Sequence, residues 1–505
     1  MKRIMTLVLA AAFVFGSLGI ANAQSGVDVK VKGWFDFAFG YGDINFQDSR
    51  LAGERRERNR DNFIARQRAR AQINFIASEN LQAVLFFEIG DIDWGHNPPA
   101  GPTVGRGSGG ALAADGVNIE TRRAYIDWMI PNTGVSVRMG IQGLALPLAT
   151  KMGANPVFDD DVAALTVSYK INSTFALTAF WARPFNVNIT DPANRSLDDE
   201  MDMFGVILPV SLDGIEITPW FVWANVGSAT GLHSYMVGNG LTQSNPMTYE
   251  GSDSASAWWA GIGTTVNMFD PLTFAFDVMY GDLGQVDLKG MPTNARFRNI
   301  DETRWGSRGW FVDAKIDYAF DFGTLGIFGW WSTGDTTSGL NAGRSGRMAA
   351  GFSSSGFGPT TFGWDGHYGI GDGSIAGYAG SGTWGVGIQL ADFSFIDKLS
   401  HTLRFTYYSG TNDKDVISKH ARDRQFMTFK APAVHAGQGG LYLTDGDNAF
   451  EVNFDHKYKI YENLTAVLEL GYIHLDYDDV WNNAFNTGSQ SDDAWKAEIH
   501  FNYSF

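Results

Sequence analysis

The chain has 505 residues, no cysteine and a formal net charge of −17 at pH 7. The absence of cysteine excludes a disulfide framework and thiol chemistry, and the acidic balance argues against nucleic-acid binding, which needs basic patches. With 44% hydrophobic residues and 60 glycines, a chain of this length could form several soluble domains or one large barrel.

The N-terminus has the features of a secretory signal peptide. Lys2 and Arg3 precede an apolar run over residues 5–20, and an Ala-Asn-Ala cleavage site follows at residues 21–23. Beyond it there is no apolar run of about 18 residues, so no helical membrane span is expected. The expected division is therefore 1–23 for the signal peptide and 24–505 for a single β-barrel domain.

The rest of the chain is predicted to form β-strands with one apolar and one polar face. In residues 27–40, valine and phenylalanine occupy most odd positions, and Asp28 and Asp36 are among the even ones. The same period of two recurs over residues 309–320 and 450–460. About 18 such strands are predicted, with 16 as the alternative count.

The connections between these strands alternate in length. Short turns carry Asn, Asp, Gly or Pro, whereas long connections rich in Gly, Ser and Asp are predicted at residues 91–117, 227–256, 334–381 and 411–447. Short turns on one side and long loops on the other are typical of outer-membrane β-barrels. An even strand count also lets the first and last strands pair, so that no edge is left open in lipid.

Taken alone, alternating strands would also fit a soluble sandwich, in which the polar face meets bulk water. Aromatic residues near the strand ends favour a barrel, because such rings gather at the two membrane interfaces. The residues concerned are Trp34, Trp128, Trp181, Trp223, Trp310, Tyr318, Tyr458 and Trp495. In a barrel this wide, the polar face would line a water-filled lumen.

The final strand alternates without interruption over residues 495–505, and its apolar face ends in Phe501, Tyr503 and Phe505. This resembles the C-terminal targeting strand of Gram-negative outer-membrane barrels, which alternates in the same way and ends in Phe. The mature chain as a whole resembles the porin superfamily, and in layout the homotrimeric outer-membrane porins of sulfate-reducing bacteria. The resemblance implies a trimer of barrels that is exported through the periplasm, lies among outer-membrane lipids and lipopolysaccharide, and lets small hydrophilic solutes diffuse passively.

Three arginines form the strongest cluster of charge. Arg66, Arg68 and Arg70 share one face of the predicted second strand, and none can face lipid cheaply, since each would cost roughly 2–4 kcal/mol near the bilayer midplane. We expect them to face the lumen, and Arg123 and Arg138 match this phase on the fourth and fifth strands. The alternative is a solvated arginine face that binds nearby carboxylates and has no role in transport.

An acidic run, Asp159-Asp160-Asp161, ends the third long connection, predicted at residues 144–160. In porins the third outer loop often folds into the barrel and carries carboxylates that face arginines, and the resemblance implies the same here, although the Pro-Glu-Phe-Gly-Gly sequence of enteric porins is absent. The alternatives are an exposed acidic run or a Ca²⁺ site. A basic lumen would favour small anions such as sulfate or phosphate, whereas the acidic total would suggest cation preference if the loops dominate. The lumen argument is the better one, because field lines focus in a narrow pore with low-dielectric walls.

Enzyme signatures are not found in the sequence: there is no G-x-S-x-G, H-E-x-x-H or Walker A pattern. Two G-x-G-x-x-G matches, at Gly105 and Gly380, do not open a helix in a βαβ unit and read as glycine-rich loop. We therefore expect no enzyme activity and, apart from the Ca²⁺ alternative, no cofactor. The alternatives to a passive channel are a structural or adhesive barrel and a substrate-selective channel with a sugar or carboxylate slide. Aromatic residues along the lumen would support such a slide, and Trp220 and Trp259 are candidates.

Overall fold

The computed structural model describes residues 26–43, 62–95, 119–186, 199–228, 253–287, 304–349, 352–353, 358, 360–362, 380–418, 442–485 and 491–505. The predicted signal peptide and large parts of the long connections lie outside these residues. Among the described residues, no helix is long and apolar enough to cross a membrane.

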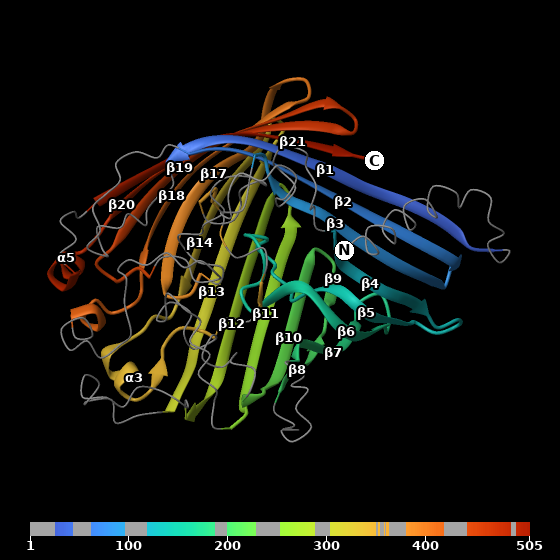
Figure 1. The fold of residues 1–505 in the computed structure, drawn as a ribbon, viewed down its shortest axis with the longest axis horizontal. Coiled ribbons are helices and arrows are strands. Elements are labelled where there is room, and N and C mark those ends of the chain that lie inside the picture. The colour runs from blue at the N-terminus through green and yellow to red at the C-terminus, as the bar shows by residue number, and fades with distance from the viewer. Residues whose placement is uncertain are drawn as a thin grey trace.

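Eighteen antiparallel strands close into a barrel (Figure 1), as the sequence predicted. β1 (Asp28–Asp43) pairs with both β2 (Asn62–Ser78) and β21 (Ser491–Ser504), so the two ends of the chain close the sheet. A short β9 (Val210–Leu212) continues β8 (Glu200–Ile207) on the same neighbour. The interruption falls at Pro209, whose nitrogen has no hydrogen to donate to a ladder.

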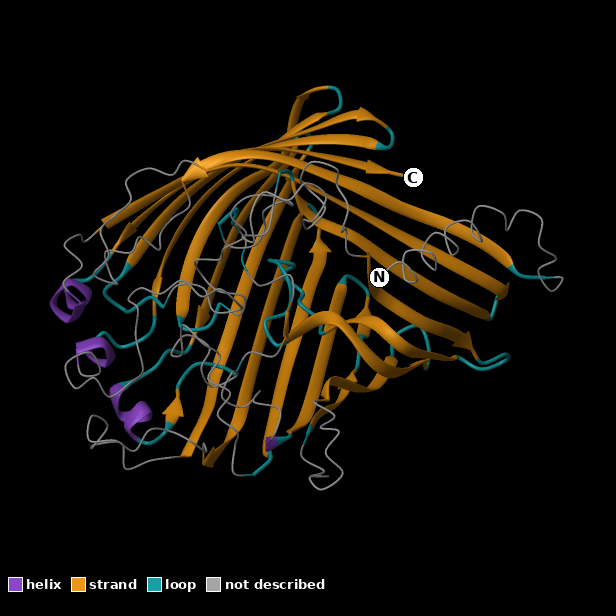
Figure 2. Ribbon diagram, viewed as in Figure 1, coloured by secondary structure: helices purple, strands orange, loops and turns teal. Residues whose placement is uncertain are grey.

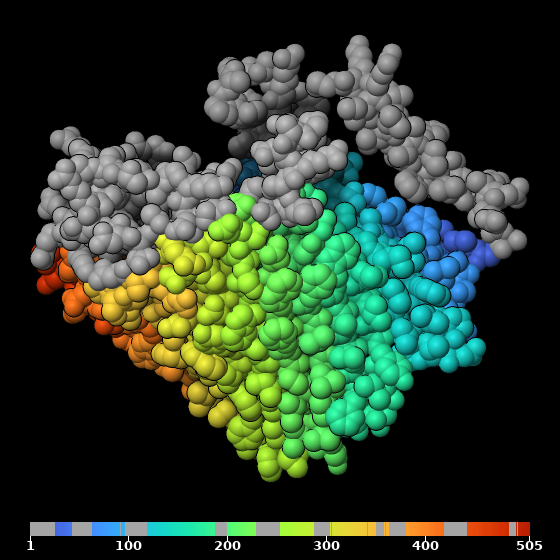
Figure 3. Space-filling model, turned by 90° about the horizontal axis from the view of Figure 1, so that it is seen from below, coloured from blue at the N-terminus to red at the C-terminus, as the bar shows by residue number. Residues whose placement is uncertain are grey.

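The other strands of the barrel follow in chain order. They are β3 (Leu81–Asp93), β4 (Ile119–Met129), β5 (Val135–Ala145), β6 (Phe158–Lys170), β7 (Ala176–Asn186), β10 (Ile215–Val226), β11 (Ala255–Phe269), β12 (Leu272–Asp287), β13 (Arg304–Phe320), β14 (Gly323–Ser332), β17 (Thr383–Ile396), β18 (Leu399–Gly410), β19 (Asn448–Tyr461) and β20 (Leu464–Asp476). Seen from below, their outer faces form one continuous wall from orange through green to blue (Figure 3). Two short helices, α3 (Thr337–Asn341) and α5 (Asp479–Phe485), lie at the end where the long connections are (Figure 2).

The outer face of this wall is apolar and exposed. On β8, for example, Phe204 and Val206 point outward and are 48% and 44% exposed, whereas Met201 and Met203 point inward and are buried. Seven of the eight aromatic residues predicted near strand ends are exposed in the same way. Trp34 is the exception, because its Nε1 donates to Asp36 Oδ2 at 3.0 Å on the inner side of β1.

The inner face is not polar throughout, contrary to the expectation of a polar lining. The inward side chains of β8, β10 and β11 include Met201, Met203, Trp220, Val222 and Trp259, none more than 4% exposed. They belong to one hydrophobic core inside the barrel. Trp220 and Trp259 are therefore packed in this core and do not form an exposed aromatic path.

Two connections enter the barrel and cover this core. The loop of residues 146–157 between β5 and β6, here called the inserted loop, reaches β12, where the backbone nitrogens of Ala149 and Thr150 donate to Asp277 at 2.8 and 2.9 Å. The connection between β14 and β17 carries β15 (Arg344–Ser345), which pairs with β13, and β16 (Phe352–Ser353), which pairs with β6. The apolar inner faces of β8–β14 are thus buried by the chain itself.

Candidate functional site

A hollow of about 600 Å³ opens on the part of the inner wall formed by β2–β6. Arg68, Arg70, Glu88, Arg122, Arg123, Asp159, Asp160 and Asp161 line it with Gly143, Leu144 and Ala145. We call its eight ionisable side chains the charged cluster. Glu88 is 5% exposed while its neighbour Ile89 is 38% exposed, which fixes the charged side of the wall as the inner one.

Arg68 and Arg70 extend from β2 toward carboxylates on the two strands beside it. Arg68 Nη2 lies 3.3 Å from Asp36 Oδ2 on β1, and Arg70 Nε donates to Glu88 Oε2 on β3. Asp36 is itself buried and accepts further hydrogen bonds from His500 and Asn502 of β21, at 3.2 and 2.7 Å. The arginine row is therefore tied to both neighbouring strands and, through Asp36, to the last strand.

Arg122 and Arg123 both point inward although they are adjacent in sequence. Phe86 pairs with Arg123 and Phe87 with Thr121, so Arg122 is the extra residue of a β-bulge in β4. Arg122 Nε lies 2.7 Å and Arg123 Nε 2.5 Å from the two carboxylate oxygens of Asp161. Arg122 Nη1 also lies 3.1 Å from Glu88 Oε2, so it links the two acidic sides of the cluster.

The arginines of β4 reach Asp161 on β6 by crossing β5. Gly143 of β5 pairs in register with Asp161, and a Cβ on Gly143 would lie 2.8 Å from Arg123 Cζ. That separation is too short for an ordinary contact. The guanidinium of Arg123 therefore fits here only because residue 143 has no Cβ.

The acidic run lies at the start of β6 and not at the end of a loop, because the connection between β5 and β6 spans only residues 146–157. Asp161 is bound by two arginines, whereas Asp160 Oδ1 accepts the backbone N–H of Asp161 at 2.7 Å. The charged cluster contains four arginines and four carboxylates, so its formal charges cancel. Its arginines and carboxylates form direct ion pairs, and the cluster carries no formal net charge.

Two predicted site residues lie outside the hollow. Arg66 Nε is 2.6 Å from Asp93 Oδ1, and Arg138 Nε and Nη2 lie 2.6 and 2.9 Å from the carboxylate of Asp127. Both are ion-paired, as in the alternative of a solvated arginine face that binds nearby carboxylates. The two-residue period of the strands thus predicted which side of the wall these arginines face. It carries no information about their height along the barrel axis.

Sequence reasoning missed Glu88 and Arg122. A signal for Arg122 exists, because charges on two consecutive strand positions would place one of them in lipid unless a bulge turns both inward. Glu88 lies among the apolar residues of β3, and only its cross-strand pairing with Arg70 identifies it as part of the cluster.

The C-terminal aromatic residues predicted to serve in targeting lie along the closure between β21 and β1. Phe501 and Tyr503 pair with Phe37 and Phe35, and the Phe505 ring lies 6.0 Å from that of Phe35. Their role in targeting stays a prediction.

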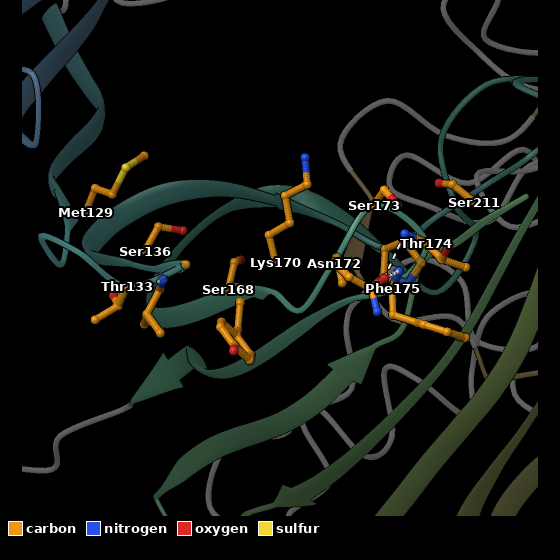
Figure 4. Close-up of a pocket in the computed structure, with 15 residues that line it drawn as sticks. Met129, Thr133, Ser136, Ser168, Lys170, Asn172, Ser173, Thr174, Phe175 and Ser211 are labelled. Carbon is orange, nitrogen blue, oxygen red and sulfur yellow. Dashed lines mark hydrogen bonds between the residues drawn. The ribbon is translucent and has the colours of Figure 1, made fainter.

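A second hollow, of about 520 Å³, lies at the short-turn end of the barrel (Figure 4). Hydroxyl side chains such as Ser136, Ser168 and Thr174 line it, and Lys170 is its only charged lining residue. In the part of the chain that the structure describes, no group of three or more His, Asp or Glu side chains could hold a metal ion. The charged cluster is therefore the stronger candidate site.

No protein-family model matches the chain, and no curated protein matches it. Among solved structures, OccAB1 of Acinetobacter baumannii superposes with a TM-score of 0.51 and 12% identity, over 96% of this chain and 99% of that one. The fold is that of an outer-membrane porin. OccK9 (OpdG) of Pseudomonas aeruginosa (TM-score 0.49, 10% identity, 95% and 98% covered) and the outer membrane protein OpdK of the same organism (0.47, 10%, 95% and 98%) are also similar.

Identities this low establish the porin fold alone. The finer resemblance to the homotrimeric porins of sulfate-reducing bacteria stays a prediction.

Proposed function

We propose that the chain forms a water-filled channel in the outer membrane for passive diffusion of small hydrophilic solutes and ions. The observation that carries this proposal is the hollow of about 600 Å³ on the inner wall of a closed barrel, lined by four arginines and four carboxylates. An apolar outer face is stable in lipid, while inward charges need water or counter-charges, so a hydrated passage along β2–β6 suits both faces.

The filled part of the barrel supports a narrow passage. The inserted loop and the connection between β14 and β17 cover the inner faces of β8–β14, which leaves the charged cluster as the wall along which solutes would pass. A passage along this wall, where Arg122 and Arg123 pair with Asp161, would present charges of both signs to dipolar solutes.

The anion preference predicted from the arginine row is retained as part of the proposal, and the charge balance limits its size. Because the formal charges of the cluster cancel, we expect the preference for small anions such as sulfate or phosphate to be weak. Arg66 and Arg138 are each compensated by a carboxylate as well, so they add no net charge.

The test is single-channel conductance of the purified protein in a planar bilayer, with the reversal potential measured under a salt gradient. Stable conductance with a reversal potential slightly toward anions is the expected result. A purified, folded barrel that does not conduct would contradict the proposal and would favour a structural or adhesive role.

Assembly and location belong to the same proposal. We propose a homotrimer among outer-membrane lipids and lipopolysaccharide, targeted through Phe501, Tyr503 and Phe505 after cleavage of residues 1–23. Conductance that rises and closes in groups of three equal steps, together with a native mass of three chains, is the expected result. A monomeric mass in mild detergent with single steps would contradict the trimer and leave the channel intact.

A further inference from the structure

Two histidines on neighbouring strands face each other on the outer wall of the barrel. His401 on β18 and His456 on β19 are cross-strand partners, and their Nδ1 atoms lie 2.6 Å apart. Both side chains are half-buried. The two residues are 55 positions apart along the chain, so the spacing of histidines in the sequence does not indicate the pair.

The outward direction of the pair follows from the alternation along its strands. On β18, Phe405 is 40% exposed and Arg404 is 6% exposed, and His401 is in phase with Phe405. On β19, His456 is in phase with Tyr458, which is 46% exposed. Tyr458 is one of the aromatic residues predicted near strand ends, and it lies roughly 7 Å along the strand from His456. The pair therefore lies beside the expected membrane interface at the short-turn end.

An ionisable side chain that faces lipid is costly and needs a partner. The Phe393 ring lies 5.2 Å from that of His401, and aromatic packing continues on β19. There the Phe454 ring lies 4.2 Å from that of His456. In these apolar surroundings each imidazole is the polar partner of the other.

The short separation fixes how the two rings share hydrogen. Two bare nitrogen lone pairs would repel at 2.6 Å, so one Nδ1 carries a hydrogen and donates it to the other Nδ1. If that hydrogen moves to Nε2 of the same ring, both Nδ1 lone pairs point into the space between the rings and both imidazoles stay neutral. Converging neutral imidazole nitrogens are ligands that divalent transition ions prefer.

We propose that His401 and His456 bind a divalent transition ion, such as Zn²⁺, Cu²⁺ or Ni²⁺, through their Nδ1 atoms and thereby join β18 to β19. Zinc binds imidazole nitrogen at about 2.0–2.1 Å, and a tetrahedral site holds two such nitrogens roughly 3.3 Å apart. Small rotations of the two side chains supply this change from 2.6 Å. Among the described residues no third His, Asp or Glu completes the set, so water fills the other positions. The proposal does not depend on the channel function.

The test uses the purified protein in detergent, stripped of metal with a chelator and then titrated with Zn²⁺ or Cu²⁺. The wild type is expected to bind one ion more per chain than His401→Phe or His456→Phe. Loss of an outer-shell partner already lowers metal affinity about 10–100-fold, so loss of a ligand should lower it by at least about 100-fold. The electron paramagnetic resonance spectrum of bound Cu²⁺ should show splitting from two nitrogens, and either variant should lose it.

His474→Phe is the matched control. His474 pairs with Asp493 at 2.6 Å on the same barrel, so its removal should leave the two-nitrogen signal of the pair intact. Binding to the folded state also stabilises it. Zn²⁺ should therefore raise the midpoint of urea unfolding more in the wild type and in His474→Phe than in His401→Phe.

Equal stoichiometry and equal Cu²⁺ spectra in the wild type and His401→Phe would overturn the proposal and leave a hydrogen-bonded pair only. Displacement of the bound ion by an equal concentration of Ca²⁺ would also overturn it, because Ca²⁺ takes oxygen ligands. If a phenylalanine variant fails to fold, His401→Gln keeps a polar partner for His456 and should still lose the two-nitrogen signal.

Discussion

Neutralising Asp160 tests the charge balance of the proposed passage most directly. Asp160→Asn keeps an Oδ1 that can accept the Asp161 N–H, and Asp161 remains bound to Arg122 and Arg123. The substitution therefore changes the formal charge of the cluster from zero to +1 with little change in packing.

The expected size follows from the volume of the hollow. A sphere of about 600 Å³ has a radius of roughly 5 Å, and a unit charge at roughly 5 Å in water interacts with an ion by about 0.8 kcal/mol. Screening at 0.1 M salt reduces this to about 0.5 kcal/mol. Anions gain and cations lose this energy, so their permeability ratio should shift about fivefold toward anions.

The assay is the reversal potential under a salt gradient. The expected shift should shrink as the salt concentration rises, because salt screens the interaction between the added charge and the permeating ion. Glu462→Gln is the matched control, since Glu462 carries the same charge but lies exposed in the turn after β19, next to Lys459. A reversal potential that is unchanged in Asp160→Asn, or equal in the two variants, would refute the placement of the passage along the charged cluster.

Three further predictions concern stability and the loops. Gly143→Ala should displace the Arg123 guanidinium and lower the free energy of unfolding by about 1–3 kcal/mol, measured by urea unfolding in detergent; an unchanged midpoint would contradict the tight approach. Asp36→Ala should leave buried donors of β2 and β21 without their acceptor, at about 1–3 kcal/mol each, in the same assay, whereas a wild-type midpoint would show that water replaces the carboxylate. Burial raises the pKa of Asp447, beside α5, despite hydrogen bonds from Thr444 and Trp481. A raised pKa in the folded state means that this group stabilises the fold more as the pH falls, so hydrogen-exchange protection of α5 should persist below neutral pH, and early loss of protection on acidification would contradict this.

The sequence predicted the barrel well because its signals are local. Alternation of apolar and polar residues gives the two faces of each strand, and turn residues separate the strands, so a count of about 18, with 16 as the alternative, follows without knowledge of distant contacts. The closure of the barrel through Phe501 and Tyr503 also follows from an even count.

The site was predicted less completely, for three physical reasons. A bulge at Arg122 changes the phase of β4. A sequence period also cannot show which positions of different strands lie at the same height along the barrel axis, and Arg66 and Arg138 lie outside the hollow for this reason. The apolar inner face of β8 depends on distant segments that fold back to cover Met201 and Met203. Such contacts between remote parts of the chain have no local signature.

The bond network around Asp36 bears on how the protein matures. Asp36 lies on the first strand, and its partners His500 and Asn502 are 464 and 466 residues away along the chain. Contacts of such long range form late, because the entropy of closing the intervening loop must be overcome first. Arg68, held by Asp36, therefore acquires its final support only when the last strand docks. A nascent or truncated chain that lacks that strand would leave Asp36, the counter-charge of Arg68, without its two hydrogen-bond donors from β21, so the support of the arginine row depends on the completion of the barrel.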